Sequence, residues 1–69
     1  MAESVYKVVE IIGTSSESWE KAAAAAVEKA AATLKDLRVA EVVQQDLQIE
    51  EGKVAKYRTK LMVSFKYLD

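Results

Sequence analysis

The sequence contains no cysteine and no histidine among its 69 residues. The lack of cysteine excludes disulfides, thiolate metal sites and thiol catalysis. The lack of histidine removes the most frequent general base and the most frequent transition-metal ligand. Any metal ion must therefore be bound by oxygen atoms, as hard cations such as calcium are. Because the chain also lacks a glycine-rich phosphate loop, we expect a binding protein and not an enzyme.

Long hydrophobic runs and an excess of one charge are also missing. No stretch reaches the 18 apolar residues that a membrane-spanning helix needs, and residues 1–4 do not begin a secretory signal with a basic segment and an apolar core. We therefore expect a cytoplasmic protein with no membrane partner. Ten Lys and Arg against eleven Asp and Glu give a net charge of -1, which does not favour a nucleic-acid partner.

What remains is the composition of one small globular domain, residues 1–69. Apolar residues make up 51% and charged residues 30%, a mixture that is typical of folded proteins. A chain this short hides only about 60% of its unfolded surface when it folds alone. Without disulfides, such folds usually rely on a metal or on partner subunits. We therefore expect the chain to associate with copies of itself.

Residues 5–12 are dense in β-branched and aromatic side chains and predict a strand that ends at Gly13. Both alternating sets of this strand are mostly apolar, so we expect both of its faces to be covered. Glu10 lies within this apolar segment, which predicts a buried carboxylate paired with a neighbouring subunit.

The segment Thr14-Ser15-Ser16-Glu17 fits a capping box, with Ser15 or Ser16 as alternative caps. It predicts a helix from Glu17 to about Lys35, with a long alanine run and Trp19 on the packing face.

Residues 39–50 and 54–67 predict two further strands, joined by a turn in which Gly52 has a positive φ. We expect the first of them to have one apolar face, formed by Val39, Val43, Leu47 and Ile49. The second alternates between an apolar face and a basic one, the latter carrying Lys56, Arg58, Lys60 and Lys66. Salt bridges with the acidic residues of the preceding strand are the main interpretation of that face, and a phosphate-bearing ligand is the alternative.

The order strand, helix, strand, strand predicts an α+β fold in which a three-stranded antiparallel sheet packs on one helix. The first strand is expected parallel to the second through a right-handed crossover, with the third strand between them.

Three segments together resemble the dodecin family: residues 5–15, which end in Gly-Thr-Ser, then Ala40-Glu41-Val42, and residues 57–65. The resemblance implies a β-α-β-β subunit in a hollow homododecamer that stores flavins such as FMN or riboflavin. In that family, tryptophans of neighbouring subunits stack on paired flavin rings and a glutamine bonds the ring edge. The corresponding positions here are Val39 and Arg58. The resemblance therefore implies weakened flavin binding.

A branch of the same family, the calcium dodecins, is more similar. The matching residues are Ser18-Trp19-Glu20, Arg38-Val39-Ala40, Gln45-Asp46, Tyr57-Arg58 and Val63-Ser64-Phe65-Lys66. This resemblance implies calcium or another hard cation as the ligand. Because the chain has no EF-hand loop, we expect a site shared between subunits, for which the candidate carboxylates are Glu41, Asp46, Glu50 and Glu51.

The resulting hypothesis is a small-ligand storage protein. Two alternatives stay open: a dodecin that binds flavin despite the two substitutions, and a structural cage without a specific ligand.

Overall fold

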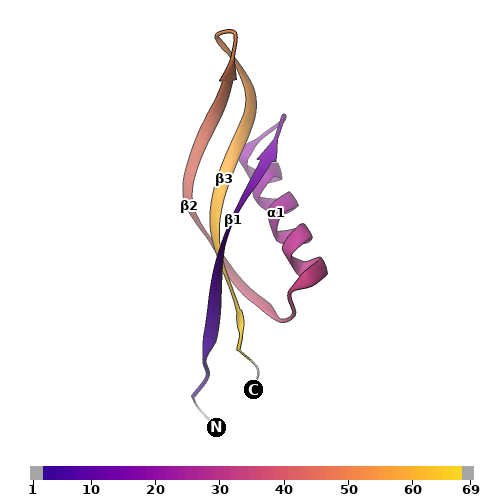
Figure 1. The fold of residues 1–69 in the computed structure, drawn as a ribbon, viewed down its shortest axis with the longest axis vertical. Helices are drawn as coiled ribbons and strands as arrows, with labels where there is room; N and C mark the ends of the chain where they lie inside the picture. The colour runs from indigo at the N-terminus through magenta and orange to yellow at the C-terminus, as the bar shows by residue number, and fades with distance from the viewer. Residues whose placement is uncertain (1–2, 68–69) are drawn as a thin grey trace.

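A computed structural model describes residues 3–67 of the chain. Four elements follow one another, β1 (Tyr6–Ser15), α1 (Trp19–Thr33), β2 (Leu37–Glu50) and β3 (Lys53–Lys66). The strands form one sheet in the order β1-β3-β2, and both outer strands are antiparallel to β3. β1 and β2 are therefore parallel to each other, and the β-α-β-β topology expected from the sequence is confirmed (Figure 1).

The helix covers one face of the sheet and leaves the other face bare (Figure 1). Its buried residues are Ala22, Ala26 and Ala30, which recur once per turn. On the sheet, Leu61 and Val63 of β3 are each only 1% exposed and form the centre of the core with Ala26. Because the helix presents small side chains, it lies close to the sheet, and the core of a single chain is correspondingly small.

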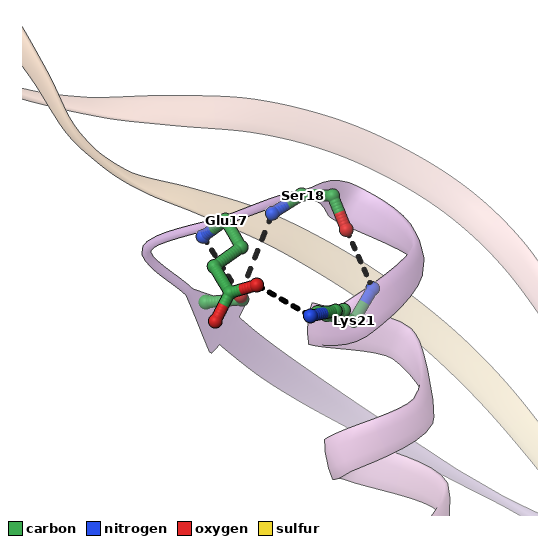
Figure 2. A network of polar contacts seen from close by, with 4 residues as sticks. Glu17, Ser18 and Lys21 are labelled. Atoms are coloured by element: carbon green, nitrogen blue, oxygen red, sulfur yellow. Dashed lines mark hydrogen bonds and ion pairs between the residues drawn. The ribbon is translucent and has the colours of Figure 1, made fainter.

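The helix starts two residues later than the sequence pattern indicated. Ser18 is the N-cap, and its hydroxyl accepts a hydrogen bond from the Lys21 backbone N–H at 3.0 Å (Figure 2). The Ser15 hydroxyl accepts the backbone N–H of Glu17 at 3.0 Å, and the Glu17 carboxylate pairs with the Lys21 ammonium. The predicted Thr14 capping box is wrong because Thr14 still belongs to β1, where it pairs with Arg58.

Two other boundaries differ from the prediction. The helix ends at Thr33 and not near Lys35, because Leu34 already has an extended backbone. Asp36 then takes a positive φ of 61°, which turns the chain so that β2 begins at Leu37, two residues before the expected start.

Irregularities in β2 divide its apolar residues between the two faces of the sheet. The register with β3 shifts between Leu37 and Val39, between Val42 and Gln44, and between Gln48 and Ile49. Residues directly opposite each other in an antiparallel pair lie on the same face. Leu47 pairs with Tyr57 on the helix side, whereas Val39 pairs with Ser64 on the bare side. The single apolar face predicted for this strand is therefore wrong, because the first two shifts each insert an extra residue in β2 and invert its alternation.

The hairpin that joins β2 and β3 is long and narrow, and its tip extends past the N-terminal end of the helix (Figure 1). The principal extents of the chain are 54 × 20 × 14 Å. At its tip, Glu51 and Gly52 have φ values of 53° and 74°. Positive φ at both central residues is the type I′ geometry of two-residue hairpin loops, so the positive φ expected at Gly52 is confirmed.

Candidate ligand-binding face

The predicted site residues of β1–β3 gather on the sheet face turned away from α1, which we call the outer face. The register defines this face as successive rows of paired residues across β1, β3 and β2. Four of these rows are Val8–Ser64–Val39, Glu10–Met62–Glu41, Ile12–Lys60–Gln44 and Thr14–Arg58–Asp46.

Glu10 lies on this face and is exposed in the single chain, so its expected burial against a neighbouring subunit stays a prediction. The apolar side chains around it, such as Val8 and Ile12, are also about half exposed. The helix covers the opposite face of β1, and no other element within residues 3–67 covers this one (Figure 1).

Arg58 and Asp46 form a bidentate ion pair in the middle of the outer face. The guanidinium Nε lies 2.7 Å from Oδ1 of the carboxylate, and Nη2 lies 3.0 Å from Oδ2. The two side chains are 41% and 37% exposed. The hydrogen bonds from Arg58 lower the pKa of Asp46, and the same bonds raise the pKa of Arg58. The expected salt bridge between the two strands is thus confirmed at this pair.

Trp19 connects the start of the helix to the same part of the hairpin. Its indole Nε1 donates to the Asp46 carbonyl at 3.0 Å, and its ring meets Tyr57 edge-on with centroids 5.2 Å apart. The buried Thr59 hydroxyl donates to the Trp19 carbonyl at 3.0 Å. Trp19 is therefore a packing residue, as expected, and it holds the strand that carries Asp46.

Val39 is 63% exposed on the outer face. Its carbonyl accepts a bond from the Ser64 hydroxyl at 3.3 Å, which fixes the backbone but leaves the side chain free. Within β1–β3, Tyr6 is the aromatic residue that the register places on this face, in the row next to that of Val39. The structure thus offers an aliphatic side chain, and no ring, at the position where the resemblance implies a stacking tryptophan.

The four candidate carboxylates do not converge within one chain. Glu41 shares a row with Glu10, but Met62 lies between them, so their backbones are about 10 Å apart. Glu50 accepts a bond from the Gln48 amide at 3.2 Å, and Glu51 lies in the turn beyond it. Across residues 3–67, no three acidic, histidine or cysteine residues form a group that could hold a metal ion.

The sequence predicted salt bridges between these two strands, but it did not predict that Asp46 pairs with Arg58. An uninterrupted ladder from the Glu50–Lys53 pair would place Asp46 opposite Tyr57. The irregularity between Gln48 and Ile49 moves it opposite Arg58 instead.

A family model described as Dodecin matches residues 5–68 of this chain. The chain belongs to the dodecin family. The calcium dodecin of Mycobacterium tuberculosis is 54% identical over 63 residues, which cover 91% of this chain and 89% of that protein. The family resemblance read from the sequence, including its closeness to the calcium branch, is therefore confirmed.

Solved dodecin structures have the same fold. The dodecin of Streptomyces coelicolor superposes with a TM-score of 0.93 at 36% identity, covering 100% of this chain and 99% of the other. The calcium dodecin of Mycobacterium tuberculosis gives 0.84 at 55% identity, covering 94% and 93%, and is described as calcium chelating with a calcium-binding site. In the part of this dodecin that the structure describes, no helix has the length and apolarity to cross a membrane.

Proposed function

We propose that this dodecin binds and stores a small ligand inside a hollow homododecamer, and that the ligand is calcium or another hard cation. One observation carries the choice of ligand class: at the two positions where the resemblance implies flavin contacts, the outer face has an aliphatic Val39 and an Arg58 tied to Asp46. The relative at 54% identity that is named a calcium dodecin supports the cation.

Flavin binding is weak in this proposal because both contacts are changed. Stacking on an aromatic side chain contributes about 1 to 3 kcal/mol per base in nucleic-acid complexes, and Val39 has no ring to supply it. The Nε and Nη2 groups of Arg58 are already bonded to Asp46, so only Nη1 is left for a ring edge, and the guanidinium is held toward β2. Retained flavin binding is the alternative outcome.

Calcium needs six to eight oxygen ligands, which the candidate carboxylates can supply only from several subunits. Glu41, Glu50 and Glu51 are exposed and form no ion pair within residues 3–67, so they are the freer candidates. Asp46 also stays a candidate, but a cation there has to displace Arg58. We propose that symmetry brings copies of these carboxylates together.

Self-association is supported by what one chain leaves uncovered. Eleven large hydrophobic side chains are exposed within residues 3–67, whereas the buried apolar core has five residues. β1 and β2 are both edge strands with unpaired backbone groups. The proposal also includes one domain over residues 1–69, a cytoplasmic location and the absence of nucleic-acid and membrane partners. A cage without a specific ligand is the alternative function.

Native mass spectrometry of the protein purified without chelator tests the assembly and the ligand in one spectrum. We expect a dodecamer with metal-sized mass increments that disappear after chelation. Monomers would overturn the assembly, and flavin-sized increments would overturn the argument from Val39 and Arg58.

Thermal unfolding of the chelated protein, with and without added calcium, then tests whether binding is specific. A native-state ligand at 100 times its Kd stabilises by about 2.7 kcal/mol, so the melting temperature should rise with calcium. Glu41→Gln should reduce this rise, while Glu28→Gln, which changes another exposed carboxylate on α1, should not. A dodecamer whose melting temperature does not change with calcium would favour the cage without a specific ligand.

A further inference from the structure

Three cationic side chains form a row on the outer face. Lys56, Arg58 and Lys60 occupy alternate positions of β3, so they lie on one face of the sheet at intervals of about 7 Å along the strand. We call these three residues the cation row. Their partners on β2 are Gln48, Asp46 and Gln44. Three positive charges therefore face one carboxylate.

That carboxylate does not neutralise the row. Asp46 is bonded to the Nε and Nη2 of Arg58, which leaves Nη1 for another acceptor. Lys60 also lowers the pKa of Asp46 by its charge, so two cations share one anion. Lys56 and Lys60 make no ion pair with any residue in the range 3–67. Among the cation row and Asp46, a surplus of two positive charges thus remains.

Carboxylates lie beyond both ends of the row. Glu10 and Glu41 occupy the next row beyond Lys60. Glu50 lies beyond Lys56, where it is paired across the strands with Lys53 and binds the Gln48 amide at 3.2 Å. Glu10 and Glu41 repel an anion that extends past Lys60, and the opposite charges of Glu50 and Lys53 leave no net positive charge beyond Lys56. The charge pattern therefore fits a short linear anion about as long as the row and disfavours a polymer such as a nucleic acid.

We propose that the cation row binds a linear oligophosphate, either free or as the phosphate chain of a nucleotide. A guanidinium and ammonium groups suit phosphate oxygens, and the Gln44 amide and the Thr14 hydroxyl, which flank Lys60 and Arg58, are neutral donors beside them. This binding is separate from the cation storage proposed above, because it uses basic side chains of the same face and needs no calcium.

Isothermal titration of the assembled, chelator-treated protein with inorganic tripolyphosphate at low salt tests the proposal. We expect binding that weakens as salt rises. Lys56→Gln and Lys60→Gln should each weaken it about two- to fivefold, the range of single exposed ion pairs. Lys29→Gln, on the exposed surface of α1, should leave it unchanged. A nucleoside triphosphate that binds as tripolyphosphate does, with no binding of the nucleoside, identifies the phosphate chain as the recognised group.

Asp46→Asn gives a result that a purely structural role would not produce. Removing the one carboxylate that faces the row should tighten tripolyphosphate binding about two- to fivefold. A change in Trp19 fluorescence offers a second measure of tripolyphosphate binding, because the indole donates to the Asp46 carbonyl.

Three outcomes would overturn the proposal: no binding of tripolyphosphate at low salt, an equal loss in Lys29→Gln, or weaker binding in Asp46→Asn. Because chelator is present throughout, failure to store calcium would not affect any of these results.

Discussion

Gly13 marks the closest approach of the first strand to the helix. A Cβ built on this residue would lie 2.0 Å from the carbonyl oxygen of Ala22 and 2.9 Å from the Cβ of Ala26. The nearest obstacle is helix backbone, which cannot rotate away as a side chain would. Glycine is therefore required here by packing and not by an unusual φ.

Gly13→Ala should lower the free energy of unfolding by about 1 to 3 kcal/mol, the usual cost of overpacking a tight contact. Urea denaturation measures it as a lower midpoint at unchanged slope. Gly52→Asn is the matched control, because nothing lies within 4 Å of that position and asparagine tolerates its positive φ. Equal midpoints for the two variants would contradict the close contact.

The Asp46–Arg58 pair predicts a pH dependence of stability. The folded-state pKa of Asp46 is lowered from its ordinary value of 3.8, mainly by the hydrogen bonds from Arg58. A lowered pKa means that the stabilisation is fully present above 3.8 and is lost as the pH falls through the lower folded-state value. At pH 7 the pair is intact.

Asp46→Asn should therefore melt at a lower temperature than the parent protein at pH 7, and the difference should shrink below pH 3.8. Melting curves over a pH series measure it. Asp36→Asn is the control, since its contact with Arg38 is long, at 4.0 Å, and asparagine suits its positive φ. A difference for Asp46→Asn that stays constant down to acid pH would contradict the assignment.

At the scale of elements, the sequence was sufficient for the order, the type and the topology of the strands and helix. Alternating apolar residues predicted the strands, the alanine run predicted the helix, and connection rules predicted β3 in the middle. The ends of the elements were not predicted, because several hydroxyls between residues 14 and 18 fit a cap. Which of them caps depends on how far β1 continues its pairing with β3.

The register shifts between β2 and β3 could not be predicted either, because no residue type in the sequence marks them. No glycine or proline marks them, and each inserts one extra residue, in β2 at the first two and in β3 at the third. The candidate site depends on this shift, because it places Asp46 opposite Arg58. The separate residues of the site were therefore predictable, and their contact was not.

Ser18→Ala tests the cap that the structure assigns. The Ser18 hydroxyl accepts the Lys21 N–H, so its loss should reduce the free energy of unfolding by about 1 kcal/mol. Chemical denaturation followed by circular dichroism measures the change. Thr14→Ala, the cap that the sequence pattern suggested, should have a smaller effect because Thr14 is an exposed strand residue. A larger destabilisation by Thr14→Ala than by Ser18→Ala would instead support the capping box predicted from the sequence.

At the scale of the whole molecule, the length of the chain predicted a need for partners, and the structure shows which surfaces require them. The small alanine-lined core leaves the outer face and the projecting hairpin with exposed apolar side chains. Contacts between copies belong to several chains, so neither the sequence nor a single chain defines the ligands that meet across an axis. A variant designed to restore flavin binding between subunits therefore tests how the chains are arranged around such an axis.

The double variant Val39→Trp/Arg58→Gln restores the two residue types that the resemblance implies for flavin binding. If copies of position 39 face each other across the proposed assembly, two new rings should stack on the ligand, at about 1 to 3 kcal/mol per stacked pair. Because 1.4 kcal/mol is a factor of ten in affinity, riboflavin should bind at least about tenfold more tightly than to the parent protein. Quenching of riboflavin fluorescence measures this.

The control for this gain is Gln48→Trp/Arg58→Gln, which places the ring on the same outer face, opposite Lys56 and nearer the hairpin tip. An equal gain in the control would mean that any exposed tryptophan binds flavin, and the argument from Val39 would fail. A gain only with Val39→Trp, and only in the assembled protein, would show that the flavin pocket persists between subunits. The weak flavin binding of the parent protein would then be due to the side chains at positions 39 and 58 and not to a different assembly.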